Sequence, residues 1–180
     1  MTIINPADET EAKLAVKAAL DHDGPVYMRF GRLAVPVIFG DDYKFEIGKG
    51  VELKEGNDVT IIATGLMVNE AMQAHDLLKA EGIGARVINI ATIKPLDKEI
   101  ILKAANETGA IVTAEEHSVI GGLGSAVSEV LAEEYPVPVL RVGTKDVFGR
   151  SGNPAALLKL YGLAEETIVK TVKAAIEKKK

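Results

Sequence analysis

The stretch AEEHSVIGGLGSAVSEVLAEE, residues 114–134, decides the fold. It starts as the end of a buried strand, turns at glycines, and continues as a helix predicted to begin at Gly124–Ser125. A strand that passes through a short turn directly into a helix is typical of α/β sheets. Ligands in such sheets bind beyond the carboxyl ends of the strands, and helix N-termini attract anions. The stretch is therefore a candidate binding site as well as a structural corner.

On both sides of this stretch, strands and helices alternate over short loops. Near-continuous apolar runs predict strands buried on both faces, and apolar residues at helical spacing predict the helices between them. This alternation predicts an α/β fold, with three layers, an open and mostly parallel sheet, and helices on both faces. The predicted strands are 58–65, 85–90, 110–114 and 137–142, and the predicted helices are 67–81, 98–108, 124–134, 154–161 and 165–178.

The first forty residues are harder to close into a core. Asp8 is predicted to cap a helix, with Glu11 completing a capping-box pair, and Val26–Phe30 is predicted to be a strand. A lone strand leaves both edges unpaired, and the apolar run Leu33–Gly40 has no evident partner. Either this segment docks onto the rest of the chain, or it is the tail of a domain whose bulk lies elsewhere; the second interpretation is favoured. Residues 41–50 are polar, contain two glycines, and predict a linker.

The composition narrows the classes of function. The net charge of −5 argues against nucleic acid as a partner, because such binding needs a clustered basic surface. The sequence contains no cysteine, which excludes disulfides and thiol nucleophiles and fits a cytoplasmic protein. No apolar run approaches the roughly 18–20 residues that span a bilayer, and MTIINPADE lacks the regions of a signal peptide. No membrane association is expected.

The acidic and imidazole groups before the glycine turn are the first candidate site. Glu115, Glu116 and His117 are consecutive, so they point in different directions along an extended chain, whereas a metal ion needs three or four converging ligands. No metal site is predicted. An acid–base role for His117 is chemically open. The favoured interpretation is that His117 orders the turn.

The glycines of the turn allow three interpretations. Gly121, Gly122 and Gly124, with Ser125, could cradle an anion, lie against a partner chain, or simply permit tight packing of strand and helix. The string GGLGS lacks the G-x-G-x-x-G spacing of dinucleotide sites, and no Walker-type Gly-Lys-Ser/Thr is present. The packing interpretation is favoured.

Arginines near strand ends are the third candidate. Arg29 and Arg32 flank a Phe-Gly turn after the first predicted strand, and Arg150 lies in a similar Phe-Gly-Arg string. A guanidinium can bind a phosphate through two parallel hydrogen bonds, although most arginines are simply solvated. Anion binding is therefore a candidate role for Arg29 and Arg32, with Arg150 as a weaker case, and solvated surface is the alternative.

Six segments together resemble the C-terminal section of transketolase. The resemblance runs in register over nearly the whole chain, and the last segment favours transketolase over its relatives. The segments are PADETEAKLAV (6–16), GPVYMRFGRLAVP (24–36), GNDVTIIATG (56–65), VINIATIKPLD (87–97), EEHSVIGGLGSAV (115–127) and KDVFGRSGNPAALLKLYGL (145–163).

The resemblance implies a domain layout. Residues 1–40 resemble the C-terminal remnant of a pyrimidine-binding domain, and residues 41–50 a linker. Residues 51–180 resemble the transketolase C-terminal domain, a sheet of about five strands. The sheet partners of the first segment would then lie upstream.

The resemblance also implies an activity. Transketolases transfer a two-carbon ketol unit from a ketose phosphate to an aldose phosphate in the pentose phosphate pathway, using thiamine diphosphate and a divalent metal, Mg or Ca. The Gly-Asp-Gly…Asn motif of the metal–diphosphate site is absent here, so cofactor binding is expected mainly outside this chain. The alternatives are the corresponding domain of 1-deoxyxylulose-5-phosphate synthase or of a 2-oxoacid dehydrogenase beta subunit, or a stand-alone regulatory domain that binds an anion at GGLGS.

One functional residue follows from the resemblance. Arg32 stands in the Arg-x-x-x-Pro context, Arg32 to Pro36, in which the family binds the substrate phosphate. No catalytic residue is inherited, because the C-terminal domain serves mainly dimer assembly. The chain alone is expected to be inactive, with sugar phosphates as ligands, an N-terminal transketolase section or subunit as partner, and a homodimer as the assembly.

Overall fold

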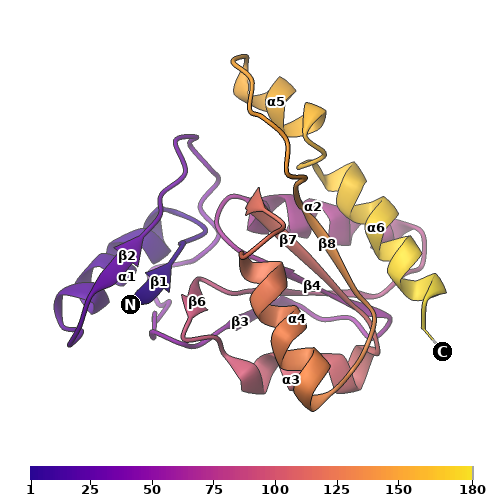
Figure 1. Cartoon of the computed structure of the whole chain (residues 1–180), viewed down its shortest axis with the longest axis horizontal. Coiled ribbons are helices and arrows are strands. Elements are labelled where there is room, and N and C mark those ends of the chain that lie inside the picture. The colour runs from indigo at the N-terminus through magenta and orange to yellow at the C-terminus, as the bar shows by residue number, and fades with distance from the viewer. Residues whose placement is uncertain (180) are drawn as a thin grey trace.

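The computed structural model describes residues 1–179 as two sheets with their helices (Figure 1). The five-stranded main sheet lies in the C-terminal two thirds of the chain, and the small three-stranded sheet is built around the N-terminus. The elements in chain order are β1 (Thr2–Ile4), α1 (Glu9–Leu20), β2 (Val26–Met28), β3 (Val51–Lys54), β4 (Val59–Ala63), α2 (Met67–Ala80), β5 (Ala85–Asn89), β6 (Thr92–Lys94), α3 (Lys98–Thr108), β7 (Ile111–Ser118), α4 (Leu123–Glu134), β8 (Val139–Thr144), α5 (Pro154–Leu160) and α6 (Glu165–Glu177).

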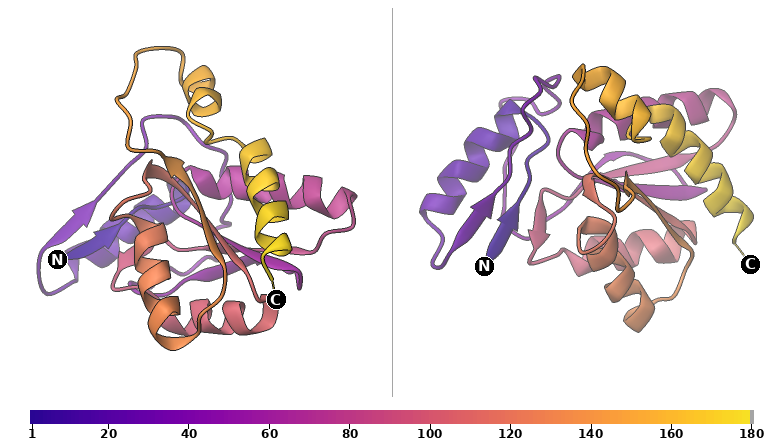
Figure 2. Two further views of the ribbon diagram at one scale, coloured as in Figure 1. Left: turned by 45° about the vertical axis from the view of Figure 1, so that its right-hand side comes forward. Right: turned by 45° about the horizontal axis from the view of Figure 1, so that its top comes forward.

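The main sheet has the strand order β3-β5-β4-β7-β8. Strands β5, β4, β7 and β8 are parallel, and β3 pairs with β5 antiparallel at one edge. Every residue of β4 and β5 is buried, as expected for central strands that are covered on both faces. Helices α2 and α6 pack on one face and α3 and α4 on the other (Figures 1 and 2). The predicted three-layer α/β fold is confirmed.

Besides β1, the short strands β3 and β6 were not predicted from the sequence. Strand β3 directly follows the predicted linker and β6 follows the predicted strand 85–90, and no strand was predicted at either place. Both carry charged residues and are at most four residues long, so neither shows a clear alternation of apolar and polar positions. Within the described chain, none of the helices is long and apolar enough to span a bilayer.

The expectation that Val26–Phe30 forms a lone strand was wrong. Its first three residues form β2, which pairs parallel with β1, and β1 pairs antiparallel with β6. Strand β1 has only three residues and lies at the start of the sequence, where no periodicity could reveal it. The small sheet therefore joins the N-terminal segment to β6, which follows β5 of the main sheet.

The N-terminal segment lies over the carboxyl ends of the main-sheet strands. The Asn5 amide donates to the carbonyl of Ala91 over 2.8 Å, and the Thr64 hydroxyl donates to the carbonyl of Asn5 over 3.1 Å. Ala91 follows β5 and Thr64 follows β4. The edge formed by the carboxyl ends of the strands, where open α/β folds usually bind ligands, thus faces β1 and β2 (Figure 2).

A buried carboxylate holds this contact together. Glu11, fully buried in α1, accepts from the Ala7 amide (2.7 Å), the Tyr43 hydroxyl (2.7 Å) and the Asn89 side-chain amide (2.7 Å). Burial raises the pKa of Glu11 despite these three donors. One carboxylate therefore joins the first helix, the linker and the end of β5.

Asp8 confirms its predicted role and has a second one. It caps α1 by accepting from the Glu11 amide over 2.8 Å, and its other oxygen accepts from the amides of Ile38 (2.6 Å) and Phe39 (2.8 Å). The Phe39 ring is buried and stacks on Tyr43 with ring centroids 3.9 Å apart. The apolar run Leu33–Gly40 thus docks onto this chain. The division at residues 41–50 remains a prediction.

Candidate functional site

The glycine turn before α4 is closed by one of its own carboxylates. Glu115, at the buried end of β7, accepts from the Leu123 amide through Oε2 and from the Gly124 amide through Oε1, both at 2.7 Å. Burial raises the pKa of Glu115, and the two N–H groups oppose that rise. The first amides of the helix, where an external anion would bind, are therefore already occupied.

Two further amides of the turn also donate to side chains within it. Ser125 Oγ accepts from the Gly121 amide over 2.9 Å, and Ser118 Oγ accepts from the Ile120 amide over 3.1 Å. A Cβ on Gly122 would collide with Oε2 of Glu115 and lie 2.8 Å from its Cδ. The turn is built around the Glu115 carboxylate, and an anion at Gly121–Ser125 would have to displace it.

Glu116 and His117 diverge from Glu115. Glu116 forms an ion pair with Arg29 (3.2 Å between Oε2 and Nη2), with both side chains about one third exposed. His117 is exposed, and its Nδ1 donates to the carbonyl of its neighbour Ser118 over 3.0 Å. Glu115, rather than His117, makes the hydrogen bonds that span the turn.

An open cleft of about 770 Å³ lies beside this turn. It is bounded by the segment after β2, the carboxyl ends of β7 and β8, and the loop that leads into α5. Arg29 and Arg32 line it from one side and Arg150 from the other, with Glu116 and His117 between them. The structure therefore brings all three predicted arginines to one cavity, although Arg150 follows Arg32 by more than one hundred residues.

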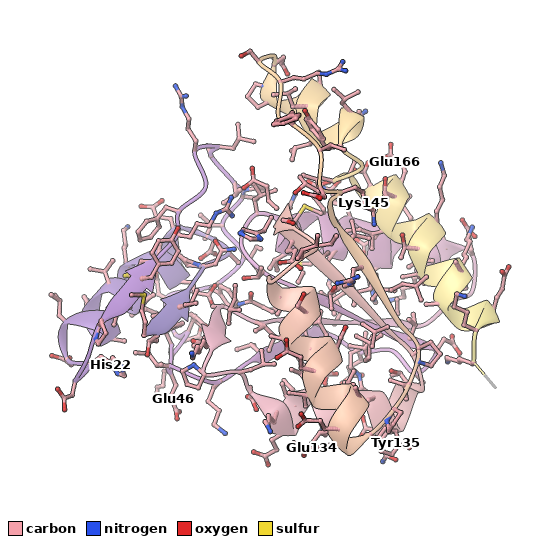
Figure 3. The ribbon with its side chains drawn as sticks, viewed as in Figure 1. His22, Glu46, Glu134, Tyr135, Lys145 and Glu166 are labelled. Carbon is pink, nitrogen blue, oxygen red and sulfur yellow. The ribbon has the colours of Figure 1, made fainter. Side chains whose placement is uncertain are left out.

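The opposite end of the sheet carries different chemistry. Figure 3 shows Lys145 near the carboxyl end of β8, on the side of α5, whereas Glu134 and Tyr135 lie at the far end of α4. There the Lys98 ammonium pairs with Glu134 over 2.7 Å, and Tyr135 donates to the Asn106 side chain over 3.1 Å. These groups serve packing between α3 and α4.

Sequence reasoning missed the wall that completes the cleft. Thr144, at the end of β8, and Tyr161, after α5, both line it. Thr144 stands in none of the quoted segments, and Tyr161 stands in the last one without having been singled out; only the tertiary arrangement brings them near Arg32. The available signal was the repeated Phe-Gly-Arg string at Arg150.

The comparison with known families decides the family. Residues 48–168 match the family described as "Transketolase, C-terminal domain". The chain belongs to the transketolase family. The match covers α2–α5 and the whole main sheet, so the predicted resemblance is confirmed.

Individual relatives extend the likeness to the N-terminal segment. A solved structure described as a split-gene transketolase, an inactive β4 tetramer, is 53% identical, with a TM-score of 0.98 over 100% of this chain and 59% of that one. The 6-deoxy-6-sulfo-D-fructose transketolase subunit of Clostridium sp. is 46% identical over 99% of this chain and 56% of its own length. A 1-deoxy-D-xylulose-5-phosphate synthase of Heliobacterium modesticaldum is 41% identical over 96% of this chain and 27% of its own length. This chain thus spans little more than half of the transketolase subunit.

The residues of this chain do not fit a metal–diphosphate site. Among residues 1–179, no three His, Asp or Glu side chains lie close enough to hold a metal ion. Of the three histidines, His75 donates to the carbonyl of Ala85 and His22 bonds the Thr2 hydroxyl. No reaction step through thiamine diphosphate is derived from these residues.

Proposed function

We propose that this chain is the C-terminal section of a transketolase and that Arg32 binds the terminal phosphate of the sugar substrate. The observation that supports this most is the position of Arg32. It lines the cleft at the carboxyl ends of β7 and β8, within the Arg32-to-Pro36 context that the family uses for phosphate. Ligand binding at this edge of the sheet is the usual arrangement in open α/β folds.

Arg29 has a supporting role in this proposal. Its ion pair with Glu116 at 3.2 Å compensates its charge and fixes the segment that carries Arg32 against the end of β7. Arg32 then presents a planar guanidinium fork, which matches two phosphate oxygens. In this proposal, the Arg29–Glu116 ion pair positions the segment, and the Arg32 guanidinium binds the phosphate.

The proposed chemistry needs a second section of protein. Thiamine diphosphate, with Mg or Ca, supplies the carbanion chemistry when bound, and we assign it to the section that carries the cofactor motifs. Residues 1–40 are proposed to be the end of a pyrimidine-binding domain, and residues 51–180 the C-terminal domain that assembles a homodimer or a larger oligomer. The description of the split-gene structure as inactive supports the proposal that this chain alone transfers no ketol unit.

The substrate class is a sugar with a terminal anion. The names of two relatives contain a 6-sulfo sugar and a sugar 5-phosphate, and both sugars carry an anionic group at the end of the carbon chain. A phosphate in the pentose phosphate pathway is the proposed ligand, and the cytoplasm, which suits a chain without cysteine, is the proposed location.

The test compares two acceptors in the assembled enzyme. The full-length protein containing Arg32→Gln is combined with the cofactor-binding section, and ketol transfer from 3-hydroxypyruvate is measured with ribose 5-phosphate and with glycolaldehyde. We expect KM for ribose 5-phosphate to rise about 30-fold, the value of a lost charge-assisted contact, with glycolaldehyde nearly unchanged. Equal effects on both acceptors would contradict the assignment of Arg32.

The same assembled protein can be tested for a second candidate function, the synthesis of 1-deoxyxylulose 5-phosphate. The 41% identity to a deoxyxylulose-phosphate synthase makes that activity worth measuring. Incubation with pyruvate and glyceraldehyde 3-phosphate tests for decarboxylation. Carbon dioxide release without ketol transfer would show that the assembled protein is the synthase and not a transketolase.

A further inference from the structure

The loop between β8 and α5 forms the wall of the cleft opposite Arg32. It is supported at both ends. The Tyr161 hydroxyl donates to the Phe148 carbonyl over 3.0 Å, and the Asn153 side chain accepts from the Ala155 amide over 3.0 Å at the start of α5. The loop therefore holds Arg150 at the edge of the cavity.

The arginines of the chain divide into two groups by their partners. Arg29 pairs with Glu116, Arg86 pairs with Glu107, and Arg141 donates to the Val119 carbonyl over 2.8 Å. Within residues 1–179, Arg32 and Arg150 have no carboxylate within 4.0 Å and no hydrogen-bond acceptor. These two guanidinium groups line the same cleft.

This placement leaves an uncompensated positive charge. Three guanidinium groups line the cleft against the single carboxylate of Glu116, which Arg29 already engages, in a chain whose net charge is −5. Leu157, Leu158 and Leu163 line the same cavity, and an apolar wall lowers the local dielectric constant and so strengthens ionic contacts beside it. Like charges held in one partly apolar cleft favour an anion between them.

We propose that Arg150 is a second ligand for the anion that Arg32 binds. The sugar phosphate lies with its terminal phosphate between the two guanidinium groups, one from the segment after β2 and one from the loop before α5. The C-terminal domain then contributes directly to substrate binding as well as to assembly. This inference rests on the proposed function and adds a specificity-determining residue to it.

The test uses Arg150→Gln in the full-length protein assembled with the cofactor-binding section. With 3-hydroxypyruvate as donor, we expect KM for ribose 5-phosphate to rise about tenfold and the inhibition constant of inorganic phosphate to rise by a similar factor. The values for glycolaldehyde should change less than about twofold, because that acceptor carries no phosphate. Arg150→Lys, which keeps the charge but loses the fork, should fall between the two.

Lys159→Gln provides the matched control. Lys159 is exposed in the last turn of α5 and does not line the cleft, so this variant removes the same charge nearby without removing the contact. An equal loss in Lys159→Gln, or equal effects on both acceptors in Arg150→Gln, would overturn the inference. So would weaker assembly by light scattering with unchanged KM, which would assign Arg150 to a subunit contact.

The failure of this inference is distinguishable from failure of the proposed function. If Arg32→Gln discriminates between the two acceptors and Arg150→Gln does not, only the role of Arg150 is overturned. If the assembled wild-type protein shows no ketol transfer, the proposed function itself fails. The inhibition by inorganic phosphate reports on Arg150 in the first case.

Discussion

The glycine turn and the arginine cleft lie side by side, but they differ in whether their polar groups have partners within the chain. In the turn, Glu115 and two serines accept hydrogen bonds from four backbone amides, which lie where an anion would otherwise bind. In the cleft, Arg32 and Arg150 have no partner among the described residues, although carboxylates are common in this chain. A group that is satisfied internally supports the fold, whereas a charged group left unpaired in a cavity is available to a ligand.

This comparison predicts separate consequences for the two regions. Changes in the turn should reduce the free energy of unfolding, because buried hydrogen bonds and packing are lost. Changes in the cleft should leave stability nearly unchanged and alter binding. The following variants test whether the turn governs stability and the cleft governs binding. They are given from the largest to the smallest expected change in stability.

Gly122→Ala should be the most destabilising. The new Cβ would collide with the Glu115 carboxylate and lie 3.1 Å from the Ser118 carbonyl oxygen, so the cap would have to move. We expect a loss of about 3 kcal/mol in urea unfolding. Gly149→Ala in the cleft loop is the matched control: no atom lies within 4 Å of its Cβ, and stability should change by less than about 0.5 kcal/mol. Equal losses in both variants would break the comparison.

Glu115→Ala should cost somewhat less. It leaves the buried amides of Leu123 and Gly124 without an acceptor, which destabilises the folded state. Because the variant no longer buries a carboxylate, part of this loss of stability is offset. We expect a loss of about 2 kcal/mol. Glu116→Ala, which breaks only a partly exposed ion pair with Arg29, should cost at most about 0.5 kcal/mol. A larger loss in Glu116→Ala than in Glu115→Ala would contradict the capping role.

Glu11→Gln tests the buried carboxylate through pH. Desolvation raises the folded-state pKa of Glu11 above its ordinary 4.5, and Asp8 adds to the rise, while Ala7, Tyr43 and Asn89 oppose it. The folded state therefore holds this proton more tightly than the unfolded state. The contribution to stability is complete below pH 4.5 and is lost as the pH rises through the raised value.

The measurement is urea unfolding at several pH values. The wild type should lose stability from pH 4.5 towards neutral pH, and Glu11→Gln should show a flatter dependence over the same range. Burial raises the pKa of Glu115 as well, so part of the dependence should remain in the variant. If the free energy of unfolding depends on pH as steeply in Glu11→Gln as in the wild type, a group other than Glu11 causes the pH dependence.

Arg32→Gln and Arg150→Gln should have the smallest effect on stability. Both side chains are exposed and have no partner within residues 1–179, so the free energy of unfolding should change by at most about 0.5 kcal/mol. Removal of like charge from one cleft could only reduce repulsion. A loss above 2 kcal/mol, measured by urea unfolding, would mean that these groups support the fold.

The sequence predicted the elements whose periodicity extends over many residues. The buried runs of β4, β5 and β7 and the apolar stripes of α2 and α6 gave the three-layer sheet. Strands β1, β3 and β6 were missed because three or four residues carry no period, and only tertiary pairing defines them.

The candidate site was predictable by residue type and not by arrangement. Arg29 and Arg32 stood out as neighbours at a strand end, and Arg150 as a similar string. Their convergence depends on the loop before α5 facing the segment after β2, which is a long-range contact. Glu115 was grouped with Glu116 and His117, since a sequence does not show which of three consecutive side chains is buried.

A structure of the assembled protein with ribose 5-phosphate tests the central claim most directly. We predict that the phosphate lies within hydrogen-bonding distance of the Arg32 guanidinium, and that the Leu123 and Gly124 amides still donate to Glu115. A phosphate bound at Gly121–Ser125 with the Glu115 carboxylate displaced would contradict the account.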